Sequence, residues 1–149
     1  MRAVVQRVSS ARVSIGGREH TSIGRGLLVL VGVEKNDTES DAATLAKKIV
    51  ELRVFEDDSG RMNRSLLEVE GEVLAVSQFT LLGDSQKGRR PSFEKAAPPE
   101  EARRLYELFV ATVDRAGVEV STGVFRGMMD VELTNNGPVT LLLDTRKAF

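Results

Sequence analysis

The chain has 149 residues, a formal net charge of −1 and no cysteine. This length predicts one domain over residues 1–149. The charge gives no general attraction for nucleic acid, and the absence of cysteine excludes disulfides, thiolate metal sites and a cysteine nucleophile. The N-terminal segment is broken by Gln6 and Arg7, so it is not a signal peptide, and no apolar run approaches membrane-spanning length. We therefore expect a soluble, cytoplasmic protein.

The first third of the chain is predicted to form three strands and a helix. Residues 2–15 are typical of a long strand, Gly16-Gly17 predicts a hairpin turn, and residues 18–23 return as a short polar strand. Residues 26–33 are continuously apolar, which predicts a central strand buried on both faces. Residues 38–41 have the pattern of a capping box, and a helix with one apolar face is expected after them.

The remaining segments complete an α+β pattern. Residues 56–60 form an acidic loop without the ligand spacing of a calcium site, so a solvated turn is favoured. Residues 72–79 predict another strand, and residues 98–117 predict a second helix. Three strands are expected to close the chain, at residues 118–125, 128–134 and 139–144. We predict a largely antiparallel sheet, curled or doubled, with two main helices packed outside.

A turn signal, Asn136-Gly137-Pro138, separates the last two expected strands. Asn-Gly between apolar runs indicates a hairpin, because both residues tolerate positive φ. Pro138 cannot donate to a strand ladder, and it restricts the conformation of Gly137. From these residues alone, a tight turn between two core strands is favoured.

Familiar catalytic constellations are mostly absent. The single histidine, His20, lies on a short polar strand, where an exposed position is favoured over general-base catalysis. Ser77, Gln78, Phe79 and Thr80 gather two hydroxyls and an amide where an apolar strand ends, and such ends often carry function. On this fact alone, hydroxyls that satisfy a turn are the slightly better explanation. No base is adjacent, so stabilisation by backbone N–H groups is the more natural chemistry.

The one dense basic cluster consists of Lys87, Arg89 and Arg90, in a loop with Phe93 nearby. A solvated surface loop and a phosphate-binding patch explain this composition equally well.

Together, these segments resemble the D-aminoacyl-tRNA deacylases, also called D-tyrosyl-tRNA deacylases, nearly end to end. Ser77-Gln78-Phe79-Thr80 and Gly137-Pro138-Val139-Thr140 carry the resemblance, because the two motifs are specific in this order and at this separation. Further similarity lies at residues 1–8, 26–32, 60–63 and 90–93. The resemblance implies a cytoplasmic homodimer with active sites at the subunit interface, which hydrolyses the ester between a D-amino acid and the 3′-terminal adenosine of tRNA.

The resemblance also implies individual roles. Gly137-Pro138 corresponds to a Gly-cis-Pro element that reaches into the partner's site, where its carbonyls collide with an L side chain but not with a D side chain. Residues 77–80 match the catalytic segment that holds the adenosine and the ester. Met129 falls near the adenine, and Arg7 matches an arginine that braces the turn. Whether Thr80 attacks the ester or only positions it is left open.

Two functional hypotheses follow. The first is an enzyme that removes D-amino acids from tRNA, rejects L-aminoacyl-tRNA and acts on glycyl-tRNA, which has no side chain to exclude. Rejection by backbone atoms requires no metal or other cofactor. The alternative is a non-catalytic module that binds tRNA acceptor ends, with the basic cluster as its phosphate contact. We expect neither a membrane nor a DNA partner.

Overall fold

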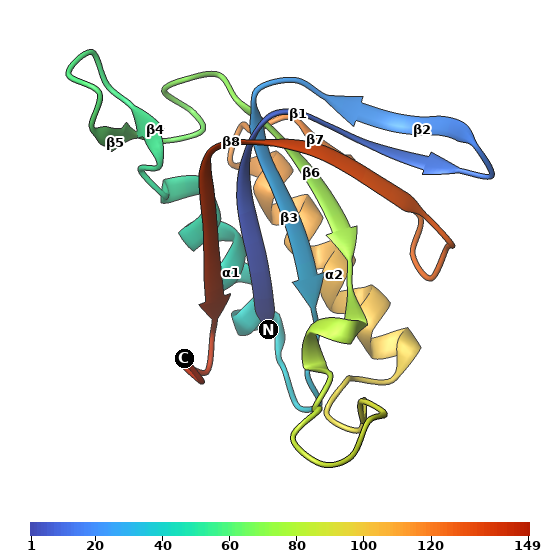
Figure 1. Cartoon of the computed structure of the whole chain (residues 1–149). Helices are drawn as coiled ribbons and strands as arrows, with labels where there is room; N and C mark the ends of the chain where they lie inside the picture. Colours follow the sequence, from blue (N-terminus) through green and yellow to red (C-terminus); the bar gives the residue numbers. More distant parts are fainter.

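Two helices cover one face of a six-stranded mixed sheet in the computed structural model, which describes all residues, 1–149 (Figure 1). The strands are β1 (Arg2–Ile15), β2 (Arg18–Ile23), β3 (Gly26–Gly32), β6 (Glu72–Ser77), β7 (Val120–Thr122) and β8 (Asp130–Asp144). The helices are α1 (Glu39–Glu51) and α2 (Pro99–Arg115), and a 3-10 turn, η1 (Phe79–Leu82), follows β6. A separate small hairpin joins β4 (Phe55–Glu56) and β5 (Met62–Arg64). Neither helix has the length and apolar character needed to cross a membrane.

The long strand β1 organises the sheet. It pairs in antiparallel fashion with β3 along its first half, with β2 along its second half, and with β8 on its other edge. The pairs β3–β6 and β6–β7 are parallel, because α1 and α2 lie in the connections between them. The predicted α+β class and mostly antiparallel sheet are confirmed, and the parallel part is an addition to the prediction.

The closing segment differs from the prediction of two strands joined by a tight turn. β8 is one strand of 15 residues that pairs with β1 on both sides of the Gly-Pro motif. Gln6 pairs with Thr140 and Val8 pairs with Asn135, so β8 advances by five residues between two paired positions that are two residues apart on β1. Residues 136–138 therefore bulge out of a continuous strand, because β1 is long enough to bind both halves of β8. We call these three residues the bulge.

Two other boundaries also differ. The predicted strand over residues 118–125 is reduced to Val120–Thr122, and the chain then makes a turn in which the Gly127 N–H donates to the Val124 carbonyl at 2.9 Å. The predicted strand over residues 72–79 ends at Ser77, shortly before η1 begins. Both changes replace regular strand with irregular backbone at the same end of the sheet.

The main core lies between the sheet and the two helices. Alternate residues of β1 and β3 point toward the apolar faces of α1 and α2, and the largest fully buried side chains there include Phe55, Phe109 and Leu27. At the start of α1, the Thr38 N–H donates to Asp41 Oδ2 at 2.8 Å, as the capping-box pattern predicts. The acidic loop is a tight turn in which Asp57 Oδ1 accepts the Ser59 and Arg61 N–H groups.

Candidate active site

A groove of about 800 Å³ lies at the end of β6 where the strand gives way to irregular backbone. Four stretches of chain form its walls: the end of β6 with η1, the segment after β3, the segment that leads into α2, and the loop between β7 and β8. The groove is lined by four of the predicted site residues: Ser77, Gln78, Phe79 and Met129. Their neighbours in the groove include Phe93, Phe125 and Met128.

The Ser77–Thr80 segment is positioned by the central strand. The Gln78 N–H donates to the Val31 carbonyl at 2.7 Å, which extends the parallel β3–β6 pairing by one residue. The chain then turns into η1, and the Gln78 side-chain amide donates to Thr80 Oγ1. The first N–H groups of such a turn have no partner within it, so those of Phe79 and Thr80 are suited to bind an oxygen of a ligand. This segment offers hydroxyl, amide and N–H groups but no adjacent base.

Apolar side chains form the other part of the groove lining. Phe79 is 55% exposed and meets Phe93 edge to face, with ring centroids 5.1 Å apart. Met129 accepts the Val124 N–H through its sulfur at 3.4 Å, and a β-carbon at Gly123 would lie only 2.7 Å from that sulfur. Aromatic rings and a thioether around a slot favour a planar ligand.

Two side chains of α2, the exposed Arg103 and the buried Tyr106, support the Phe125 wall. The Arg103 guanidinium lies over the Phe125 ring, 4.9 Å from its centroid, and the Tyr106 ring packs 6.1 Å away. The Tyr106 hydroxyl donates to the Ala75 carbonyl of β6 at 2.9 Å. Burial raises the pKa of Tyr106, so this donor keeps its proton.

The predicted basic cluster lies beside the groove rather than in it. Lys87, Arg89 and Arg90 are exposed at the tip of a loop closed by reciprocal N–H to carbonyl bonds between Asp84 and Ser92. Two cations that the sequence did not single out, Lys35 and Arg126, line the groove itself. Arg126 has a φ of +61° in the Val124–Gly127 turn, a conformation that no sequence pattern indicated. His20 is exposed on β2 and does not line the groove.

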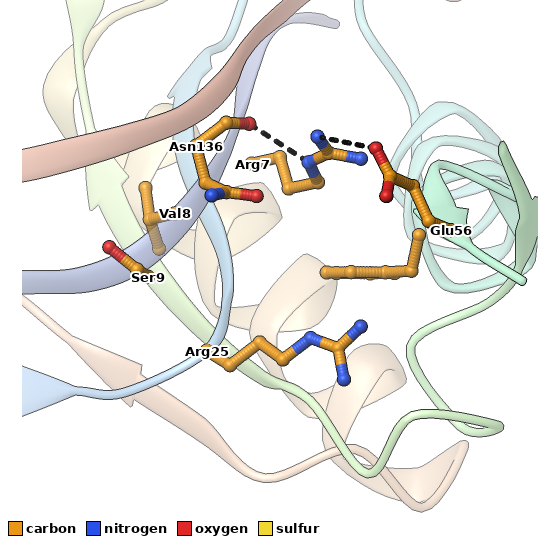
Figure 2. Close-up of a pocket in the computed structure, with 7 residues that line it drawn as sticks. Arg7, Val8, Ser9, Arg25, Glu56 and Asn136 are labelled. Carbon is orange, nitrogen blue, oxygen red and sulfur yellow. Dashed lines mark hydrogen bonds and ion pairs between the residues drawn. The ribbon is translucent and has the colours of Figure 1, made fainter. Parts of the chain in front are cut away.

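The bulge lies on β8 and is held by side chains on both of its flanks. The Gly137–Pro138 peptide bond is cis, and Gly137 has a φ of +133°. Arg7 donates through Nε to the Asn136 carbonyl at 2.9 Å and through Nη1 to the Val54 carbonyl at 2.8 Å (Figure 2). The Asn135 side chain accepts the Val139 N–H at 2.8 Å. Arg7 is therefore a buried link between the bulge and the start of β4.

Within one chain, the groove and the bulge do not meet. Ser77 pairs with Val31, Val31 with Ala3, and Ala3 with Leu143, so three strand spacings separate Ser77 from β8. The bulge lies a further four residues along, opposite Arg7. At about 4.8 Å per strand and 3.3 Å per residue, the two features are roughly 20 Å apart.

Comparison with known proteins relates this architecture to one family. The profile described as D-Tyr-tRNA(Tyr) deacylase matches residues 4–144. The D-aminoacyl-tRNA deacylase of Geobacter sulfurreducens is 59% identical, over 98% of this chain and 96% of that protein. That of Thermoanaerobacter pseudethanolicus is 56% identical over the full length of both chains.

Solved structures show the same fold. One described as c-Myc DNA Unwinding Element Binding Protein is 40% identical with a TM-score of 0.91, over 97% of this chain and 99% of that one. A probable eukaryotic D-amino acid tRNA deacylase shares the fold at 19% identity, with a TM-score of 0.80 over 95% and 97% of the two chains. The sequence matches cover the groove segment and the bulge alike, and this chain belongs to the D-aminoacyl-tRNA deacylase family.

Proposed function

We propose that this protein hydrolyses the ester between a D-amino acid and the 3′-terminal adenosine of tRNA, and that it rejects L-aminoacyl-tRNA. The observation that carries the proposal is full-length identity of 56–59% with proteins named D-aminoacyl-tRNA deacylase. The reaction adds water to the ester carbonyl, breaks the carbonyl–oxygen bond, and releases the D-amino acid and a free terminal ribose hydroxyl.

The groove suits the acceptor end of tRNA in both shape and chemistry. Its volume of about 800 Å³ accommodates a nucleoside together with an aminoacyl group. We place the adenine among the apolar side chains of Phe79, Phe93 and Met129, because aromatic and sulfur-containing walls bind the face of a base. The ester then lies at Ser77–Thr80, where the polar groups gather.

The catalytic segment works by position and electrostatics. The hydroxyls of Ser77 and Thr80 have no neighbouring base to activate them, so neither is well prepared as a nucleophile. The free N–H groups at Phe79 and Thr80 instead stabilise the negative charge that develops on the ester oxygen, while the Gln78 amide orients Thr80. Losing one such donor typically lowers the rate by about 10²- to 10³-fold. A ribose hydroxyl of the substrate assists the attack.

Selectivity is assigned to the bulge of a second copy of the chain. The bulge and the groove lie too far apart in one chain to contact the same amino acid, whereas Gly137 and Pro138 are exposed and free to enter a partner's groove. In such a homodimer, the backbone carbonyls of Gly137 and Pro138 occupy the space an L side chain needs. A D side chain points away from them, and glycine has none, so glycyl-tRNA is hydrolysed slowly.

The tRNA body is held by exposed cations around the groove. We assign phosphate contacts to Lys87, Arg89 and Arg90, whose loop lies at the groove margin. The net charge of −1 supplies no broad attraction for a duplex, so we propose no DNA function, although one solved relative is named for DNA binding. We place the activity in the cytoplasm, where tRNA is charged and used.

The proposed function is tested by incubating the pure protein with D-tyrosyl-tRNA and L-tyrosyl-tRNA and measuring tyrosine release. We expect rapid release of D-tyrosine and release of L-tyrosine no faster than the uncatalysed rate. Protein that retards tRNA in a gel but releases neither enantiomer would support the binding-module alternative. Preferential release of L-tyrosine would refute the proposed selectivity.

A further inference from the structure

A second, smaller pocket of about 220 Å³ lies on the inner side of the bulge, separate from the groove. It is formed where β1, β4, the start of β3 and the bulge come together, and it is lined by Arg7, Val8, Ser9, Arg25, Phe55, Glu56 and Asn136. Figure 2 shows Arg7 and Arg25 extending toward the same side of this pocket, with Glu56 next to Arg7. Both arginine side chains therefore contribute to the lining of this pocket.

The charge of Arg7 is incompletely compensated. Arg7 is 6% exposed, and two of its nitrogens donate to carbonyls. The third, Nη2, has only a carboxylate oxygen of Glu56 at 3.9 Å, which is too long for a hydrogen bond. Nη2 is not a fully buried donor, because Asp37 Oδ1 is the one buried side-chain polar atom that lacks a hydrogen-bond partner, so Nη2 is open to an additional anion from the pocket.

Arg25 supplies the second cation. Its guanidinium lies over the Phe55 ring, 5.3 Å from the centroid, and its nitrogens form no hydrogen bond or ion pair within the chain. All its donors are free, while the aromatic contact keeps the group beside the pocket. Ser9, on the same strand as Arg7, adds a hydroxyl to the lining of the pocket.

We propose that this pocket binds a phosphate-type oxyanion between Arg7 and Arg25. Guanidinium groups match the geometry of tetrahedral phosphate oxygens, and the volume admits a phosphate group with a bound water. The Glu56 side chain is 59% exposed and held only by the long contact to Arg7, so it can swing toward solvent when an anion enters. Glu56 is thus an internal competitor for the site.

The test is a thermal-shift and calorimetric titration of the full-length protein with inorganic phosphate at constant ionic strength, with chloride as the reference salt. We expect saturable stabilisation by phosphate beyond that of chloride. Arg25→Gln should weaken phosphate binding by about tenfold or more, the range of a lost charge-assisted hydrogen bond. Glu56→Gln should tighten binding by about two- to fivefold, because it removes an exposed competing charge.

Arg18→Gln is the matched control, because Arg18 is another exposed arginine, on β2, that does not line the pocket. It should bind phosphate as the unchanged protein does. Absence of saturable binding, or equal affinity in the Arg25 and Arg18 variants, would overturn the proposal.

An additional measurement, of tRNA affinity, distinguishes free phosphate from a backbone phosphate of tRNA as the natural ligand of the pocket. This measurement rests on the proposed function. If tRNA supplies the group, Arg25→Gln also lowers tRNA affinity and phosphate competes with tRNA. If free phosphate is the occupant, tRNA affinity is unchanged in that variant. Either result requires that phosphate binds the pocket in the titration.

Discussion

The contacts of Arg7 lead to the most specific mutational prediction. In Arg7→Met, a side chain of similar length fills the same space but donates no hydrogen bond. The Val54 carbonyl, on a residue that is 6% exposed, then loses its Arg7 donor, whereas the Asn136 carbonyl lies on the exposed bulge and regains water. Leaving one buried acceptor without a partner costs about 1–3 kcal/mol, and the lost contact at the bulge adds up to about 1 kcal/mol. We expect a total loss of about 1–4 kcal/mol in the free energy of unfolding.

Arg7→Met should also change the position of the bulge and lower the selectivity for the D substrate. Arg7 is the side chain that ties the Asn136 carbonyl to β1 and the start of β4, so its loss frees the peptide next to Gly137. We expect the ratio of D-tyrosine to L-tyrosine release to fall by about tenfold or more, because an exclusion contact misplaced by about 1 Å no longer discriminates. Arg7→Lys, which reaches one of the two carbonyls, should give an intermediate result.

Urea unfolding and the tRNA release assay measure these two effects separately. The matched control is Arg12→Met, on the same strand, because Arg12 is exposed and pairs only with the exposed Glu132. It should leave both stability and selectivity close to those of the unchanged protein. If Arg7→Met unfolds at the same urea concentration and keeps its enantiomer ratio, the assigned link between Arg7 and the bulge is wrong.

Three further predictions concern the groove, the buried tyrosine and the histidine. Phe79→Ala removes an exposed ring that meets Phe93, so KM for D-tyrosyl-tRNA should rise by about tenfold with little change in stability; an unchanged KM would place the base elsewhere. Burial raises the pKa of Tyr106 in the folded state, whereas the unfolded chain ionises this tyrosine at a pKa of about 10. The free energy of unfolding should therefore be unaffected by this group below about pH 10 and should fall as the pH rises above it. Urea unfolding at a series of pH values above about 10 should show this fall in the unchanged protein and a smaller fall in Tyr106→Phe. An equal fall in both proteins would contradict the role given to Tyr106. His20→Ala should keep full turnover, and a loss of several orders of magnitude would point to imidazole catalysis.

Local patterns in the sequence predicted most of the regular elements. The 14-residue strand β1, the apolar strand β3 and the helices α1 and α2 each carry a periodicity or capping signal contained within the element itself. The Ser77–Thr80 segment was also selected as a candidate from local sequence, because its polar groups follow directly on an apolar strand. These features are determined by residues adjacent in sequence, so they can be predicted from a single sequence.

The features that were missed depend on distant partners. Asn-Gly-Pro has the same local chemistry in a hairpin and in a bulge, and only pairing with β1, about 130 residues earlier, distinguishes them. The pocket between Arg7 and Arg25 joins residues that no motif connects, and the place of Lys35 in the groove depends on how the segment before α2 folds back. Family resemblance indicated Gly137-Pro138 as functional but not the strand that presents it.

The most direct test of the central claim, that the groove of one subunit and the bulge of another form one site, is complementation between two inactive variants. Phe79→Ala with Gln78→Ala disables the groove. Gly137→Ala displaces the bulge, since a β-carbon there would lie 2.9 Å from Arg7 Nη2 at a φ of +133°. We expect the displaced bulge to obstruct the partner's groove, so that this variant loses turnover of the D substrate as well as selectivity.

Each variant is first shown to be folded and inactive, and the two are then mixed, unfolded and refolded together. Random pairing into homodimers and heterodimers restores one intact site in each heterodimer, so we predict about a quarter of the D-tyrosyl-tRNA activity of the unchanged protein. A mixture as inactive as its components would contradict the claim and place the complete site within one chain.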